Sequence, residues 1–136
     1  IYTLSLHDAL PISIHEQLRA RILASEEFFK RQGQGTTAGY LQALYRVELA
    51  RDIDPTGATG WARELARGRT RSEVALAVLQ SVEARTATVQ SGYHDFLDRD
   101  ADEFGLQVFV AALQAGQSRL ELLVSLLSSD EYRARS

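Results

Sequence analysis

The fold follows from one stretch, residues 45–85, which reads "YRVELARDIDPTGATGWARELARGRTRSEVALAVLQSVEAR". Most of its pattern returns 48 positions later: residues 41–87 and 89–135 align without a gap, and 15 of the 47 aligned positions are identical. A partial third copy comes earlier, where residues 18–28, "LRARILASEEF", match the end of the later copies. A period near 50 residues is typical of helical arrays whose units bury their apolar faces by stacking on neighbours.

Each full copy predicts three helices, because apolar residues recur at helical spacing between capping signals. Asp54 is a predicted N-cap, with Pro55 at the first helical position, where its missing N–H costs nothing. Thr70 and Glu73 form a predicted capping box. The other expected caps are Thr36 or Thr37, Gly68, Asp102, Gly116, the pair Ser118 and Glu121, and Ser25, Ser81 and Ser129 at the starts of further short helices. Because no stretch alternates like a strand, we predict an all-α fold of two tandem repeats and the tail of a preceding one, packed as one small helical domain.

The chain opens on a segment that lacks this pattern. Residues 1–12, "IYTLSLHDALPI", match the in-frame translation of a common short-read sequencing adapter. We therefore expect residues 1–13 to be a non-native, adapter-derived segment of a metagenomic fragment, and the protein to be part of a longer multidomain chain. The helical repeat domain is expected at 14–136, divided into a partial repeat at 14–31, repeat one at 36–87 and repeat two at 88–136.

Composition excludes several classes of function. The net charge of −3 lacks the basic footprint of a nucleic-acid-binding protein. The absence of cysteine rules out disulfides, thiolate metal sites and a cysteine nucleophile. No apolar run approaches the roughly 18 residues of a membrane span, so we expect none. A single Lys among the basic residues and the absence of Asn suggest a GC-rich bacterial genome.

One acidic cluster resembles the start of a calcium loop. Asp98, Asp100 and Asp102 alternate as the first ligands of an EF-hand do, but that loop needs Gly at its sixth position and Glu at its twelfth. Here the sixth position is Glu103 and the twelfth is aromatic, and Ala50 replaces the first Asp in the other copy. Helix capping and pairing with an adjacent Arg fit both copies better. The three Asp are kept as weak candidates for calcium, and no other cofactor is expected.

No catalytic constellation is recognisable, so we expect no enzymatic activity. His94 and Asp95 are neighbours in sequence and would point about 100° apart on a helix. Trp61, Phe109 and Tyr132 could stack on sugar rings. However, Trp61 and Phe109 occupy equivalent positions in an apolar stripe, which favours a place in the core.

The repeated pattern resembles a bacterial family known as domain of unknown function 4214. The resemblance extends from about residue 14 to the C-terminus. In the first copy it rests on Tyr45, Leu49, Arg51, Asp52, Asp54, Pro55, Gly57, Trp61, Leu65, Gly68, Ser81 and Glu83. In the second it rests on Tyr93, Leu97, Arg99, Asp100, Asp102, Gly105, Phe109, Leu113, Gly116, Ser129, Glu131 and Tyr132. The departures are Ala50 and Asp98 in place of the usual Gly, and Ala84 in place of an aromatic residue.

The resemblance implies an extracellular or cell-surface location, because such domains occur in bacterial secreted, surface-layer and adhesion proteins. It implies a non-catalytic helical interaction module that contacts envelope polysaccharide or a protein partner. An alternative left open is an accessory helical domain of an envelope enzyme such as a glycosyltransferase.

Overall fold

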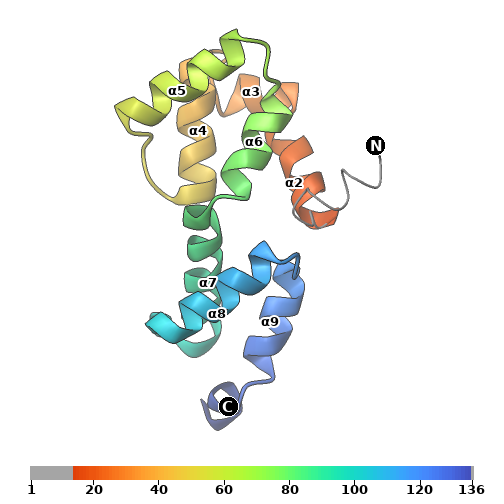
Figure 1. Cartoon of the computed structure of the whole chain (residues 1–136), viewed down its shortest axis with the longest axis vertical. Helices are drawn as coiled ribbons and strands as arrows, with labels where there is room; N and C mark the ends of the chain where they lie inside the picture. The colour runs from red at the N-terminus through yellow and green to blue at the C-terminus, as the bar shows by residue number, and fades with distance from the viewer. Residues whose placement is uncertain (1–13, 136) are drawn as a thin grey trace. The chain divides into compact units, whose positions relative to one another are not determined.

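The structure is a computed structural model that describes residues 14–135, where every regular element is an α-helix (Figure 1). The all-α prediction is confirmed. The expected adapter-derived segment, residues 1–13, lies outside the described residues. The helices are α2 (Ile14–Leu23), α3 (Glu26–Arg31), α4 (Thr37–Leu49), α5 (Pro55–Ala66), α6 (Arg71–Leu79), α7 (Val82–Leu97), α8 (Glu103–Gln114), α9 (Arg119–Leu127) and α10 (Asp130–Arg135).

The helix ends confirm the predicted capping residues. The Asp54 carboxylate accepts a hydrogen bond from the backbone N–H of Gly57 at 3.1 Å, with Pro55 in the first turn of α5. Thr70 and Glu73 make both bonds of a capping box. Ser25, Thr36, Ser81, Asp102, Ser118 and Ser129 also act as N-caps. The backbone of Gly68 and Gly116 is left-handed, with φ +106° and +105°. These local signals set where each helix begins and ends.

One helix differs from the expected scheme. Ser81 was expected to cap a short helix followed by a separate one, but α7 runs unbroken from Val82 to Leu97. In the first copy the same stretch is interrupted by residues 32–36, which separate α3 from α4. The second copy has no such insertion and contains no proline between 82 and 97, so the helix continues. The prediction of a short helix after Ser81 is therefore wrong.

The chain divides into two compact units, and the division falls between Ala84 and Arg85. The first unit comprises residues 16–84 and the second contains residues 85–135. Within 14–135, none of the helices has the length and apolar character needed to cross a bilayer.

Each unit has its own apolar core. In the first unit, side chains from α2, α4 and α6 meet: Ala20, Leu23, Tyr40, Leu41, Leu44, Tyr45, Val74, Ala75, Val78 and Leu79. In the second, they come mainly from α7, α8 and α9: Val89, Tyr93, Leu97, Ala101, Leu113, Leu122 and Leu126. Burial of these side chains, which removes their apolar surface from water, is the main term that holds the helices together.

Candidate functional site

Each unit contains an Arg–Glu pair that joins an interhelix loop to the start of a later helix. Nε of Arg51 lies 2.6 Å from Oε2 of Glu83, and its Nη2 lies 2.9 Å from Oε1. Arg99 makes the same two bonds to Glu131, both at 2.7 Å. Two parallel N–H···O bonds to one carboxylate fix the orientation of the guanidinium as well as neutralising its charge. We call Arg51–Glu83 and Arg99–Glu131 the locks of the first and second unit.

The arginine of each lock also holds the loop backbone and covers a buried tyrosine. Nη1 of Arg51 donates to the carbonyl oxygen of Asp52 at 3.0 Å, and the guanidinium lies 5.1 Å from the centre of the Tyr45 ring. A cation over an aromatic face adds electrostatic attraction to the packing. The second unit repeats these contacts with Arg99, Asp100 (2.8 Å) and Tyr93 (5.1 Å).

A glutamine in each copy braces the same loop, and sequence reasoning missed it. Oε1 of Gln42 accepts a hydrogen bond from the backbone N–H of Ile53 at 2.7 Å, and Oε1 of Gln90 accepts one from Ala101 at 2.8 Å. The signal was present, because Gln42 and Gln90 are one of the 15 identical pairs between the copies. Most residues that recur between the copies around this loop therefore serve to hold it.

The locks keep their carboxylates ionised. The hydrogen bond from Arg51 lowers the pKa of Glu83 below its ordinary value of 4.5, and the bond from Arg99 lowers the pKa of Glu131 in the same way. The pKa of Asp54 is lowered chiefly by the backbone N–H of Gly57. These carboxylates are fixed negative charges near neutral pH, as a structural ion pair or a helix cap requires.

The three Asp proposed as calcium candidates are directed to three different partners. Asp98 lies 3.6 Å from Arg135, and Asp102 accepts the N–H of Gly105 at 3.0 Å as an N-cap. Asp100 lies 2.7 Å from Nε2 of His94, a pairing that the sequence did not reveal because six positions separate the two residues. Among residues 14–135, no group of three or more His, Asp or Glu side chains is placed to hold a metal ion.

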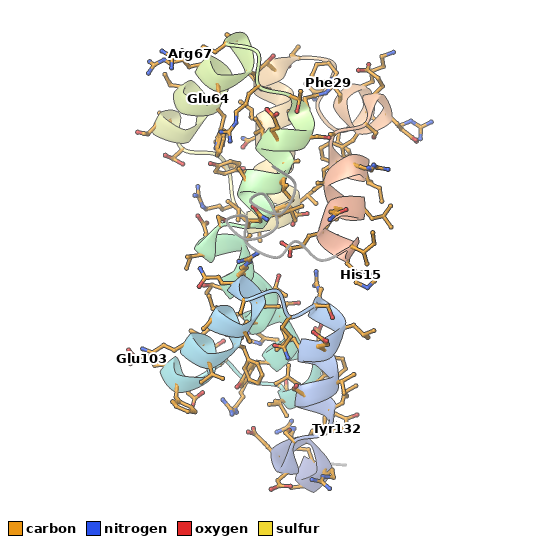
Figure 2. All side chains as sticks on the ribbon, turned by 45° about the vertical axis from the view of Figure 1, so that its right-hand side comes forward. His15, Phe29, Glu64, Arg67, Glu103 and Tyr132 are labelled. Carbon is orange, nitrogen blue, oxygen red and sulfur yellow. The ribbon has the colours of Figure 1, made fainter. Side chains whose placement is uncertain are left out.

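The aromatic residues considered for sugar stacking are half-buried. Trp61 packs against the core of the first unit, and its Nε1–H donates to the hydroxyl of Tyr45 at 2.9 Å. Phe109 meets the ring of Tyr93 edge to face, with centroids 6.2 Å apart. Tyr132, labelled in Figure 2, packs against the core of the second unit. Their geometry is that of packed side chains.

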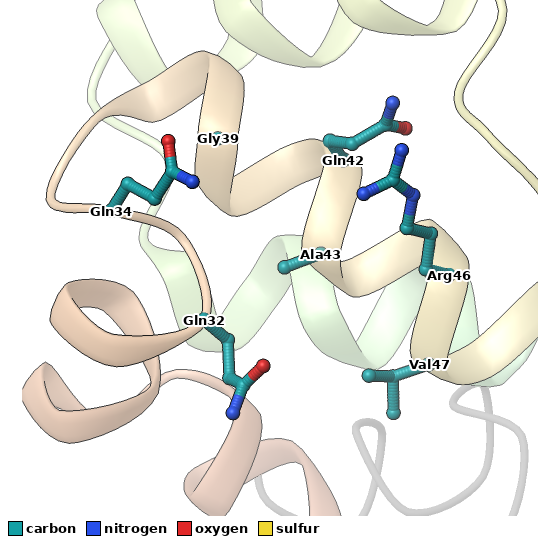
Figure 3. Close-up of a pocket in the computed structure, with 7 residues that line it drawn as sticks. All are labelled: Gln32, Gln34, Gly39, Gln42, Ala43, Arg46 and Val47. Atoms are coloured by element: carbon teal, nitrogen blue, oxygen red, sulfur yellow. The ribbon is translucent and has the colours of Figure 1, made fainter.

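A polar pocket of about 260 Å³ lies where the insertion of the first copy meets α4 (Figure 3). Its lining combines amide, guanidinium and small apolar groups, from Gln32, Gln34, Gly39, Gln42, Ala43, Arg46 and Val47. Two lining groups are held from outside the pocket. Gln42 is fixed by Ile53, as described above, and Nε of Arg46 donates to Asp52 at 2.7 Å. The second copy lacks the insertion that provides Gln32 and Gln34.

Two glycines allow the insertion to lie directly on α4. A Cβ at Gly33 would come within 2.7 Å of the Tyr40 backbone, and a Cβ at Gly39 would overlap the Gly33 carbonyl. Gln34, the residue after Gly33, has a left-handed φ of +56°. The backbone around the pocket is therefore closely fitted, and its shape depends on residues with little or no side chain.

Comparison with protein families places the chain. The family model described as domain of unknown function (DUF4214) matches residues 20–88 and 86–136. These tandem matches cover most of the sequence, so the chain belongs to this family. Comparison with curated proteins gave no match, and neither did comparison with solved structures.

Proposed function

We propose that this DUF4214 protein is a non-catalytic interaction module of a bacterial secreted or cell-surface protein, and that it binds envelope polysaccharide at the polar pocket beside α4. The observation that supports this most is the pocket itself, which contains Gln32 and Gln34 from a loop found in one copy only. The secreted location and the choice of polysaccharide as ligand rest on the occurrence of such domains in bacterial secreted and surface proteins.

The proposal is supported by a difference between repeated residues, which hold the fold, and unrepeated residues, which provide most of the pocket lining. The repeated charged residues of the locks and the capping residues Asp54 and Asp102 are engaged within their own unit. Residues committed to a scaffold carry little ligand specificity. Specificity is more readily provided by a loop that a rigid scaffold holds in place.

The chemistry of the lining suits sugar hydroxyl groups. A glutamine amide both donates and accepts hydrogen bonds, and a hydroxyl group does the same. Arg46, whose Nε is already paired with Asp52, can offer its two Nη groups to a hydroxyl or carboxylate oxygen of a sugar. Ala43 and Val47 provide small apolar surface on which the C–H face of a sugar ring can rest.

The test is a binding titration of the full chain with purified envelope polysaccharide. Replacing Gln32 and Gln34 together by Ala should weaken binding about tenfold or more, since two hydrogen bonds of about 1 kcal/mol each are removed. Gln107→Ala, at an exposed position of α8 in the other unit, is the matched control and should leave the affinity unchanged. Equal affinities of the double variant and the control, or no binding by the unaltered chain, would contradict the proposal.

A further inference from the structure

Three helices in the chain occupy the same place in the repeat. α2, α6 and α9 each end just before a serine whose hydroxyl donates to the carbonyl three residues earlier: Ser25 to Ile22 at 2.7 Å, Ser81 to Val78 at 2.6 Å, and Ser129 to Leu126 at 2.7 Å. The same serines cap the helix that follows. This shared geometry fixes the alignment of the three helices residue by residue.

Aligned in this way, the helices differ sharply in exposure at two apolar positions. Val74 and Val78 of α6 are 0% and 3% exposed, and Leu122 and Leu126 of α9 are 0% and 2% exposed. The corresponding residues of α2, Leu18 and Ile22, are 56% and 59% exposed. An apolar side chain is thus kept at both positions in all three helices, but only α2 leaves them open to water.

The two buried cases show what covers these positions. Val74 and Val78 share a core with Leu41, Leu44 and Tyr45 of α4. Leu122 and Leu126 share a core with Val89, Tyr93 and Leu97 of α7. In both units the cover is the opening helix of the repeat, with a tyrosine and aliphatic residues on one stripe.

The exposed face belongs to a helix that is held in position. Ala20 and Leu23 lie on the other side of α2 and are buried in the core of the first unit. Arg19 is also fixed, because its Nη2 lies 2.7 Å from Oε1 of Glu48 on α4. α2 therefore presents Leu18 and Ile22 on a stable support, one turn apart on the same face.

We propose that the Leu18–Ile22 face of α2 is a docking surface for the opening helix of a further DUF4214 repeat, with the Leu41, Leu44 and Tyr45 pattern of α4. The docked helix continues an interface that the chain already makes twice, between α4 and α6 and between α7 and α9. This inference goes beyond the proposed function, because it concerns assembly of repeats and involves neither the polar pocket nor a sugar.

The experiment supplies such an opening helix within the chain. Because Ile14 corresponds to Thr70, a copy of residues 36–69 inserted directly before Ile14 completes the repeat in register. Leu18→Ser and Ile22→Ser are then made in both the unaltered chain and the extended chain. Thermal unfolding and amide hydrogen exchange of α2 are measured for each.

In the unaltered chain, each serine variant should change Tm by no more than about 2 °C, because the side chains are exposed. In the extended chain each should lower Tm by about 5 °C or more, since the same side chains are then buried. The α2 amides of the extended chain should also exchange about tenfold more slowly than those of the unaltered chain.

Two controls separate docking from general effects. Leu120→Ser, on the exposed face of α9, should have the same small effect in both chains. Leu44→Ser made only in the inserted copy should abolish the slower exchange of α2. If Leu18→Ser and Ile22→Ser have equal effects on Tm in both chains, or if exchange in α2 is unchanged by the insertion, the proposal is overturned.

Discussion

The two units hold the loop that follows α4 or α7 in the same way. They differ in the segment that precedes the tyrosine of that helix, Tyr45 or Tyr93. Twenty positions separate the cap Ser25 from Tyr45 in the first copy, whereas twelve separate Ser81 from Tyr93 in the second. The additional residues break the helix and form the insertion at 32–36, while the shorter connection lets α7 run straight through. Both copies retain the lock and the loop-bracing glutamine. The contacts that hold the loop are therefore shared by both copies, whereas Gln32 and Gln34 of the pocket come from an insertion in the first copy.

The largest expected effect comes from closing the space that the insertion needs. Gly39→Ala places a methyl group against the Gly33 carbonyl and should lower the free energy of unfolding by about 3 kcal/mol. The corresponding residue of the continuous α7 is Ala87, where a Cβ is already present. Ala87→Gly should cost only about 1 kcal/mol, the ordinary price of glycine in a helix. Urea unfolding of both variants provides the comparison, and equal losses would show that the insertion imposes no special constraint.

The next largest effect concerns the locks and their dependence on pH. Because the pKa of Glu83 and of Glu131 is lowered by folding, each lock stabilises the protein fully above pH 4.5 and loses this contribution as the pH falls through the lower, folded-state pKa. Glu83→Gln and Glu131→Gln should each lower Tm at pH 7 by a few degrees and flatten the loss of Tm below pH 4.5. Thermal melts from pH 7 to pH 2 measure this. A variant whose Tm falls as steeply with acid as that of the unaltered chain would show that its lock contributes nothing.

A smaller effect should follow from making the first unit resemble the second at its aromatic pair. Trp61→Phe removes the 2.9 Å hydrogen bond to the buried Tyr45 hydroxyl and should cost about 1 kcal/mol. Tyr45→Phe removes the same bond from the other side. The loss in free energy of unfolding of the double variant should therefore be smaller than the sum of the losses of the two single variants. Strict additivity would mean that the bond makes no contribution of its own.

The smallest expected effect is an increase in the free energy of unfolding. Ala50 and Asp98 occupy equivalent positions with left-handed φ angles of 56° and 52°, a conformation that glycine adopts without strain. Ala50→Gly should raise the free energy of unfolding by about 0.5–1 kcal/mol. Asp98→Gly should raise the free energy of unfolding by less, because Asp tolerates this conformation better than Ala does. The substitution also removes the contact between Asp98 and Arg135. Chemical unfolding checks both, and a loss of stability for Ala50→Gly would contradict the argument.

What could be predicted from the sequence was local. Asp54, Thr70 and Ser118 cap their helices through neighbours three residues away, so a short window of sequence contained the whole interaction. The continuous α7 was not predicted, because it depends on what the second copy lacks relative to the first.

The pocket and the polar pairings were beyond the reach of the same reasoning. The pocket arises only when residues 32–36 fold back over α4, and the bond from Ile53 to Gln42 joins groups eleven positions apart. The pairing of Arg51 with Glu83, separated by 32 positions, requires that α7 begin beside the loop. Such contacts are set by tertiary packing. The sequence showed only that residues such as Gln42, Arg51 and Glu83 are identical between the copies and did not show which of them pair.

If the repeated Arg and Glu residues hold the interhelix loops, amide hydrogen exchange at Ile53 and Ala101 should depend on them. In the unaltered chain both N–H groups are bonded to a glutamine and should be protected. Glu83→Gln should accelerate exchange at Ile53, and Glu131→Gln should accelerate exchange at Ala101, each by about fivefold or more. Unchanged exchange at both amides in the two variants would show that the locks do not hold the loops.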